Sequence, residues 1–169
     1  MKTKIVRLLL PLSLILPIVA LPGCDILEEL DKPDYITVNV NVFANVKIGK
    51  WISSKNVVVP WPNTQVQIRI TKAGGEHVEA YKTTDEAGLT DSLTGSFKLY
   101  REQNIRVLVT VTPNSAIPDA LGGGAYDPAL HFINNGWEDL TWAEVDAARD
   151  FGETYNWYTT VYPMADVTG

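Results

Sequence analysis

The stretch ITVNVNVFANV, residues 36–46, decides the fold class. Threonine and asparagine occupy most of its odd-numbered positions. The even-numbered positions are all apolar, namely Ile36, Val38, Val40, Val42, Ala44 and Val46. A period of two directs successive side chains to opposite faces of a β-strand. The pattern therefore predicts a strand with one buried face and one solvated face.

The same period recurs further along the chain. Apolar and polar residues alternate over 64–71, directly after the stiff, non-helical segment Pro60-Trp61-Pro62-Asn63. Ala73-Gly74-Gly75-Glu76 predicts a turn into a strand at 77–84, so that 64–84 forms a hairpin. We expect further strands at 95–100, 105–111 and 155–162, where β-branched and aromatic residues gather.

Two later segments depart from the strand pattern. Thr141 and Glu144 have the spacing of a capping box, in which each side chain satisfies the other residue's backbone N–H. This spacing predicts one short helix at about 142–150, before the last strand. Residues 113–136 contain several prolines and the run Gly122-Gly123-Gly124, and they predict a long loop. Loop and helix together form an insertion at 113–152.

Short strands, turn signals and one minor helix predict an all-β protein, an antiparallel β-sandwich of the Greek-key type. The turn Thr84-Asp85-Glu86-Ala87-Gly88, set between the strand at 64–71 and the strand at 105–111, adds a more specific resemblance. Over about residues 36–112 the chain resembles the transthyretin-like sandwich of carboxypeptidase regulatory-like domains, which carry a similar Thr-Asp-x-x-Gly turn. Asp85 can bond its own backbone and Gly88 can take a positive φ, so both are expected to have a turn role, and the resemblance implies no catalytic role for them. Residues 89–94 depart from that family, in which an aromatic strand follows the glycine closely.

The N-terminus has the features of an export signal. Lys2, Lys4 and Arg7 precede an apolar segment at 8–20, which is shorter than the roughly 20 residues that span a bilayer. Leu21-Pro22-Gly23-Cys24 follows and resembles the bacterial lipoprotein motif, in which the cysteine is lipidated and becomes the first residue. Pro22 is a less usual occupant of its position. An uncleaved anchor and an ordinary secretory signal are the alternatives.

The lipoprotein resemblance implies a signal peptide at 1–23, a lipid anchor on Cys24 and an extracytoplasmic location, at the cell membrane or at a periplasmic membrane face. Cys24 is the only cysteine, so it has no disulfide partner in the chain. Residues 24–34 are expected to form a tether, and 35–169 a single β-sandwich domain. Asp25 resembles the signal for inner-membrane retention in enteric bacteria.

The charge of the chain excludes one class of partner. Acidic residues number 20 against 14 lysines and arginines, which gives a formal net charge of −6 at pH 7. A chain of this charge lacks the basic footprint of a nucleic-acid-binding protein. Anionic head groups should also repel it, so we expect the lipid, rather than surface charge, to hold it at the membrane.

Catalytic and metal-binding patterns are not recognisable in the sequence. His77 and Glu79 share one strand face, and His131 lies near several carboxylates, but neither set has the spacing of a zinc or calcium site. The sequence lacks a Gly-x-Ser-x-Gly motif and a phosphate-binding loop. We therefore expect no enzyme activity, no metal and no cofactor. A Lys–Asn isopeptide bond between Lys47 or Lys50 and Asn156 is an alternative. Such a bond needs a buried acid as catalyst, and nothing in the sequence marks one.

Aromatic residues in predicted loops and at strand ends are the best candidates for ligand binding. Exposed Trp and Tyr are typical of carbohydrate platforms and protein interfaces. Trp51 and Trp61 flank the polar segment 52–59, which we expect to be a loop, and Tyr126 and Trp137 lie in the insertion. The alternative is that some of these rings pack in the core, as we expect for Trp142.

Three functional hypotheses follow. The preferred one is a lipid-anchored, non-catalytic protein that binds another protein or a component of the cell envelope. The second is a carbohydrate-binding module that uses the loop aromatics. The third is a metal-dependent hydrolase, for which the sequence supplies histidines and carboxylates without a fixed ligand set.

Overall fold

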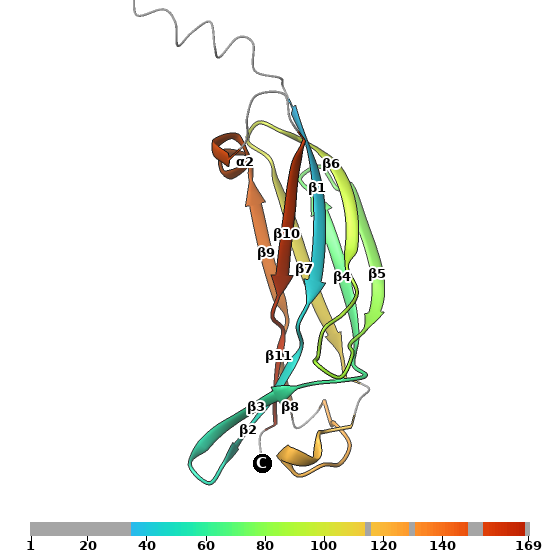
Figure 1. Cartoon of the computed structure of the whole chain (residues 1–169), viewed down its shortest axis with the longest axis vertical. Helices are drawn as coiled ribbons and strands as arrows, with labels where there is room; N and C mark the ends of the chain where they lie inside the picture. Colours follow the sequence, from blue (N-terminus) through green and yellow to red (C-terminus); the bar gives the residue numbers. More distant parts are fainter. Residues whose placement is uncertain (1–34, 114–115, 129–130, 149–153, 168–169) are drawn as a thin grey trace, which may run out of the picture. The chain divides into compact units, whose positions relative to one another are not determined.

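The computed structural model describes residues 35–113, 116–128, 131–148 and 154–167 (Figure 1). Cys24, the predicted signal peptide and the predicted tether lie outside these residues. The described part is mostly β-strand. Its elements are β1 (Tyr35–Ala44), β2 (Lys47–Ile52), β3 (Lys55–Pro60), β4 (Gln65–Lys72), β5 (His77–Thr83), β6 (Leu93–Tyr100), β7 (Asn104–Thr112), the 3₁₀ turn η1 (Asp119–Leu121), β8 (His131–Asn134), β9 (Gly136–Thr141), α2 (Trp142–Ala148), β10 (Tyr155–Val161) and β11 (Met164–Val167).

The strands form three sheets, with the orders β10-β1-β6, β5-β4-β7-β9 and β3-β2-β11-β8. The first two face each other, and β2 and β3 project as a hairpin from one end of them (Figure 1). Every second residue of β1, β4, β6 and β7 is buried between these two sheets, as the alternation at 36–46, 64–71 and 105–111 predicts. Burying a Val, Leu, Ile or Phe side chain contributes about 1.5–3 kcal/mol, so the shared core is the main source of stability.

The expectation of a purely antiparallel sandwich is wrong. β1 runs antiparallel to β6 but parallel to β10, with Val38 opposite Tyr155 and Ala44 opposite Val161. β2 likewise runs parallel to β11. Parallel neighbours need a long connection, and here almost the whole domain lies between the paired strands. Alternation reports which face of a strand is buried and carries no information on the direction of its neighbour.

The third sheet was not expected at all. Residues 52–59, predicted as a loop, belong to the β2–β3 hairpin, and the predicted loop at 113–136 contains β8. The hairpin turns at Ser53 and Ser54, which have φ values of 47° and 66°. A turn of this kind normally carries asparagine or glycine, so two serines gave no turn signal.

Local signals of turn and helix are confirmed. The Asp85 carboxylate accepts hydrogen bonds from the N–H groups of Ala87 (2.8 Å) and Leu89 (2.9 Å). Gly88 has a φ of 76°, and a Cβ there would lie 2.5 Å from the Val46 carbonyl oxygen. These contacts explain why the turn needs an aspartate and a glycine.

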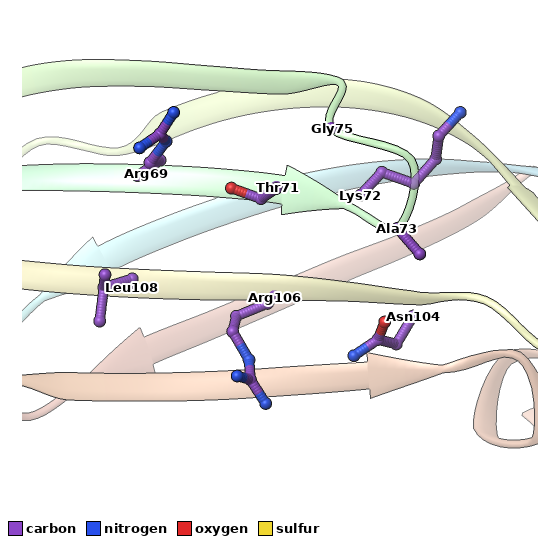
Figure 2. A pocket seen from close by; sticks show the side chains of 8 residues that line it. All are labelled: Arg69, Thr71, Lys72, Ala73, Gly75, Asn104, Arg106 and Leu108. Atoms are coloured by element: carbon purple, nitrogen blue, oxygen red, sulfur yellow. The ribbon is translucent and has the colours of Figure 1, made fainter.

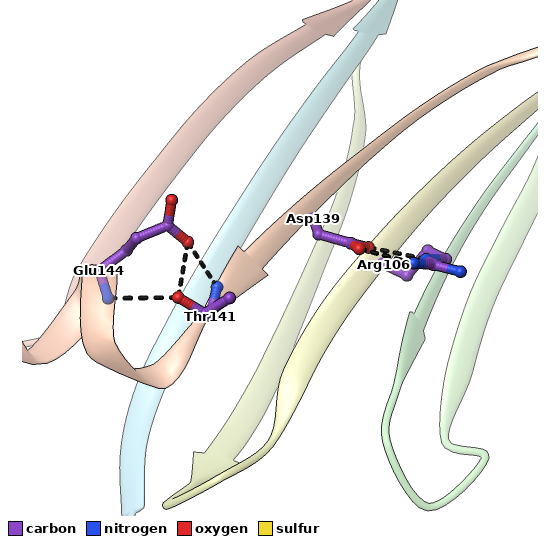
Figure 3. Close-up of polar contacts among 4 residues, drawn as sticks. All are labelled: Arg106, Asp139, Thr141 and Glu144. Atoms are coloured by element: carbon purple, nitrogen blue, oxygen red, sulfur yellow. Dashed lines mark hydrogen bonds and ion pairs between the residues drawn. The ribbon is translucent and has the colours of Figure 1, made fainter.

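The capping box also forms as predicted (Figure 3). Glu144 Oε2 accepts from the Thr141 N–H at 2.8 Å and from its hydroxyl at 2.7 Å, and the Glu144 N–H donates to Thr141 Oγ1 at 3.3 Å. The helix covers Trp142–Ala148; the end of the predicted helix lies outside the described residues. Val145 is buried and Trp142 packs against the core, as expected for that ring.

Candidate binding face

The structure divides the four aromatic candidates into two pairs. Trp61 has no exposed surface and Tyr126 only 7 %, and their ring centroids are 5.0 Å apart. Trp61 Nε1 donates a hydrogen bond to the Ala116 carbonyl oxygen at 3.1 Å. Neither ring is available at the surface, so the expectation that Trp61 and Tyr126 are exposed rings is wrong. Their role is to pack the segment 116–128 against the sandwich.

Trp51 and Trp137 are the exposed pair, at 67 % and 60 %. Trp51 belongs to β2 and Trp137 to β9, which lie in different sheets. Trp51 stands near the end of the β2–β3 hairpin, opposite Asn56. Trp137 stands on the solvent face of the β5-β4-β7-β9 sheet, among long polar side chains. These surroundings make it the better candidate for ligand binding.

Strand register assembles the side chains around Trp137. On the solvent face of β5-β4-β7-β9, Trp137 lies opposite Leu108, and Leu108 lies opposite Arg69. The next row along the strands places Arg106 between Thr71 and Asp139. We call this surface the binding face and define it by Gln67, Arg69, Thr71, Glu79, Tyr81, Asn104, Arg106, Leu108, Trp137 and Asp139.

Arg106 is the best-fixed side chain of the binding face. Its Nε and Nη2 donate to the two carboxylate oxygens of Asp139 at 2.7 and 2.6 Å (Figure 3). The hydrogen bond raises the pKa of Arg106 and holds that of Asp139 below its usual range. The guanidinium also lies 5.2 Å from the centroid of the Trp137 ring. Exposed ion pairs add little to stability, so the main effect of this pair is to fix an arginine beside an aromatic ring.

A second arginine is held in a similar way. Arg69 Nε lies 3.4 Å from Glu79 Oε2, which also accepts a hydrogen bond from Gln67 Nε2 at 3.3 Å. Tyr81, the cross-strand neighbour of Gln67, is 63 % exposed. The binding face thus has an exposed aromatic ring towards each edge and oriented planar polar groups between them.

A shallow hollow of about 540 Å³ lies in this face, between β4 and β7 (Figure 2). Arg69, Thr71, Asn104, Arg106 and Leu108 supply its side-chain lining, and Ala73 and Gly75 close one end. Lys72 also borders the hollow, but its ammonium lies 2.7 Å from Glu76 and 5.5 Å from the centroid of the Tyr100 ring. Its charge is therefore turned away from the hollow. The guanidinium groups of Arg69 and Arg106 are likewise held toward the flanking strands, by Glu79 of β5 and Asp139 of β9.

Neither a cluster of metal ligands nor a membrane-spanning helix occurs among the described residues. Within the described ranges, no group of three His, Cys, Asp or Glu side chains is placed to hold a metal ion. His77 Nδ1 lies 3.2 Å from the Gly75 carbonyl oxygen, while Glu79 is engaged with Arg69 and Gln67. Among the helices of the described residues, none is long and apolar enough to cross a bilayer.

Comparisons with other proteins give no identity. No family model matches the chain, and no curated protein or solved structure is significantly similar to it. The structure shows a mainly β-strand domain with three sheets. Its function has to be inferred from the binding face.

Sequence reasoning named Trp137 but missed its neighbours. Arg69 and Arg106 occupy outward positions of two strongly alternating strands, where a single arginine reads as an ordinary solvated residue. Asp139 lies in β9, a strand that the sequence did not reveal, so its pairing with Arg106 had no visible signal. The available clue was that both arginines occupy outward positions, on strands whose other face is expected to be buried.

Proposed function

We propose that the protein is a lipid-anchored, extracytoplasmic binding protein that engages a component of the cell envelope through the binding face, without catalysing a reaction. Cys24 carries the anchor in this proposal, and residues 35–167 carry the recognition. The observation that supports it best is the Trp137–Arg106–Asp139 arrangement on an open sheet surface. Fixed arginines and exposed Trp are the residue types that dominate binding energy at interfaces.

A shape argument supports a ligand that lies along the sheet. Four adjacent strands span about 14 Å between the outermost strand axes. The binding face has no deep cavity of the kind that encloses a small-molecule substrate. An extended ligand, such as a polymer of the envelope, fits such a surface better than a small metabolite does.

The carbohydrate-binding hypothesis is the second candidate and uses the same face. The hypothesis relies on aromatic residues predicted in loops. Of these, Trp61 and Tyr126 are buried, and Trp51 lies in a different sheet from the binding face. Trp137 keeps it open, since an exposed indole beside arginine, glutamine and asparagine side chains offers both stacking and hydrogen bonds. A polysaccharide is itself an envelope component, so the two hypotheses overlap.

Binding to envelopes tests the proposal once the anchor is removed. The Cys24→Ser protein should co-sediment with envelopes isolated from its own bacterium, because recognition resides in the domain. Trp137→Ala in the same background should release it, whereas Tyr158→Ala, which removes a comparably exposed ring from the β10-β1-β6 sheet, should not. Equal retention of both variants, or no retention of the parent, would refute the proposal.

The anchor is tested separately. The wild-type protein should incorporate a clickable palmitate analogue in a bacterial host and fractionate with membranes. Cys24→Ser should lose the label. Labelling of the serine variant would exclude Cys24 as the lipidation site without bearing on the binding face.

A further inference from the structure

The β2–β3 hairpin projects from one end of the two facing sheets, and β3 is an edge strand (Figure 1). We infer that β3 takes an extended acidic segment of a partner protein, which adds to the β3-β2-β11-β8 sheet as a further strand. This inference concerns a second surface, separate from the binding face, and does not depend on what the binding face binds.

The hairpin turn decides which backbone groups of β3 are available. The turn has two central residues, at 53–54, so Ile52 and Lys55 form the first hydrogen-bonded pair of the ladder. Hydrogen-bonded and non-hydrogen-bonded pairs then alternate along an antiparallel ladder. The N–H and C=O groups of Asn56 and Val58 therefore point away from β2, toward the open edge.

Two hydrogen bonds at the base of the hairpin agree with this alternation. Lys47 lies opposite Pro60, and its N–H donates to the Pro163 carbonyl oxygen at 3.1 Å, on the side away from β3. One residue earlier, the Val46 carbonyl oxygen accepts from the Trp61 N–H at 3.0 Å. Pro60 thus occupies a position whose N–H would face the open edge, so its missing N–H removes no bond to β2.

The composition of β3 distinguishes it from the other strands at sheet edges. β5, β6 and β9 carry charged side chains, β8 has only four residues, and β10 contacts β9 at the side of the sandwich. Charges and short lengths are the usual protection of an edge against added strands. The middle of β3 is Val57-Val58-Val59, and β2 is its only paired neighbour among the described strands. β3 is therefore the described edge best suited to accept a strand.

Charge selects the kind of strand that fits. Residues 47–60 contain three lysines and no acidic residue, within a chain whose formal net charge is −6. Lys50 lies opposite Val57, so Lys55 is its diagonal neighbour on the same face of the hairpin. Neither lysine forms an ion pair with an acidic residue of the described ranges. An added strand would place a side chain about 5 Å from Lys55, where a carboxylate is favoured and an ammonium is repelled.

The opposite face of the hairpin is suited to apolar side chains. Trp51 lies opposite Asn56 and diagonal to Val58, and these two apolar side chains are 67 % and 41 % exposed. An apolar side chain of the added strand would lie beside Val58, within reach of the indole. Successive residues of a strand alternate between faces, so the added strand should alternate acidic and apolar residues. Main-chain hydrogen bonds supply affinity in this mode of recognition, and the alternate side chains supply specificity.

A second copy of the chain is a poorer occupant of this edge. Pairing of two β3 strands would bring the lysines of both hairpins to one interface, and like charges across strands are destabilising. An acidic partner gains from the same lysines. The positive hairpin of an otherwise acidic chain also orients such a partner before contact.

The test is fluorescence anisotropy with a labelled peptide of about ten residues that alternates glutamate and valine, titrated with the full-length Cys24→Ser protein. Two peptides are matched controls. One has lysine in place of glutamate, and the other has the same composition as the acidic peptide with all glutamates before all valines. We expect the alternating acidic peptide to bind and both controls to bind at least tenfold more weakly.

Variants of β3 test the two parts of the inference separately. Val58→Pro removes an outward N–H without removing a hydrogen bond to β2, so it should weaken peptide binding at least tenfold. Val58→Thr keeps the N–H and should bind like the parent. Lys50→Glu combined with Lys55→Glu should reverse the preference, so that the lysine peptide binds more tightly than the acidic one. Lys98→Glu, on β6, should leave the preference unchanged.

The outcomes separate this inference from the proposed function. Absence of acidic peptide binding, equal binding of the acidic and lysine peptides, or equal binding to Val58→Pro and Val58→Thr would refute the inference. Loss of peptide binding in Trp137→Ala would also overturn it, because the peptide would then lie on the binding face. A parent dimer that Val58→Pro dissociates would overturn it in favour of a second copy. Far-UV circular dichroism like that of the parent verifies that each variant is folded.

Discussion

The solvent faces of the two large sheets cover the same core and differ in almost every other respect. The middle of the outer side of β10-β1-β6 carries short, uncharged side chains that bond to one another: Asn39 donates to Asn156 at 3.1 Å and Thr94 to Asn41 at 2.9 Å. Lys98 and the exposed rings of Tyr35, Tyr100 and Tyr158 lie around them. The binding face carries long, charged side chains with an exposed ring near each edge. On the first face neutral side chains bond to one another, whereas on the second the polar contacts are between charged groups, Arg106 with Asp139 and Arg69 with Glu79. Burial patterns alone would not distinguish the two surfaces.

The first prediction concerns Trp61, which lies in the core that both faces cover. Trp61→Ala should lower the free energy of unfolding by about 3–5 kcal/mol, because it empties a fully buried site and releases the segment 116–128. Urea unfolding followed by far-UV circular dichroism measures the loss. A cost below about 1 kcal/mol would contradict the assignment of Trp61 to the core.

The second prediction concerns a buried hydroxyl beneath that tryptophan. Thr84 Oγ1 donates to the Trp61 carbonyl oxygen at 2.6 Å and accepts from the Thr64 N–H at 2.9 Å. Thr84→Val keeps the shape but removes both of these buried hydrogen bonds, so stability should fall by about 1–3 kcal/mol. Thr83→Val, at the neighbouring exposed position, is the control and should be nearly neutral.

The third prediction separates the two faces directly. Trp137→Ala and Tyr158→Ala remove rings of comparable exposure from opposite sheets, and each should change stability by no more than about 0.5 kcal/mol. Only Trp137→Ala should weaken ligand binding, by about tenfold, or roughly 1.4 kcal/mol. Parallel unfolding and binding measurements on the same preparations test this. An equal loss of binding in both variants would remove the distinction between the faces.

The fourth and smallest effect is a pH dependence confined to the binding face and its neighbouring helix. The pKa of Asp139 is lowered by its hydrogen bond from Arg106, and that of Glu144 by its bonds from Thr141. Groups with a depressed folded-state pKa stabilise the protein above their unfolded values, about 3.9 and 4.3, and this contribution is lost as pH falls through the folded values. Wild type should therefore lose thermal stability below about pH 4 more steeply than the Asp139→Asn, Glu144→Gln double variant. An equal fall in melting temperature of the two proteins as the pH is lowered would refute this prediction.

The sequence predicted the sandwich strands because alternation is a strong signal wherever one face is buried. The predicted ranges of β1, β4 and β7 agree with the observed strands within one or two residues at each end, and the Asp85 turn and the Thr141 cap lie where the sequence predicts them. Each of these depends on local chemistry: a period of two, a side chain that bonds to its own backbone, or a paired Thr and Glu. Strand direction and sheet partners depend on distant residues, which explains the wrong prediction for β10.

The candidate site was less predictable for the same reason. Trp137 was found because tryptophan is conspicuous in any sequence. Arg69 and Arg106 become significant only when the register between β4 and β7 places them diagonally across from each other. Trp61 was misjudged as a surface ring because nothing in its proline-rich segment reveals the pocket that Tyr126 completes from a position far along the chain.

Labelling of single cysteines in intact cells tests the central claim most directly. Cys24 is the only native cysteine, and its lipidation would leave an introduced thiol as the sole target. Leu108→Cys probes the binding face, and Ser96→Cys, an exposed position on β6, probes the opposite sheet. We predict that residue 108 is protected from a membrane-impermeant maleimide in cells but reacts in the purified protein, while residue 96 reacts in both. Equal reactivity of the two positions in cells would contradict the assignment of the binding face.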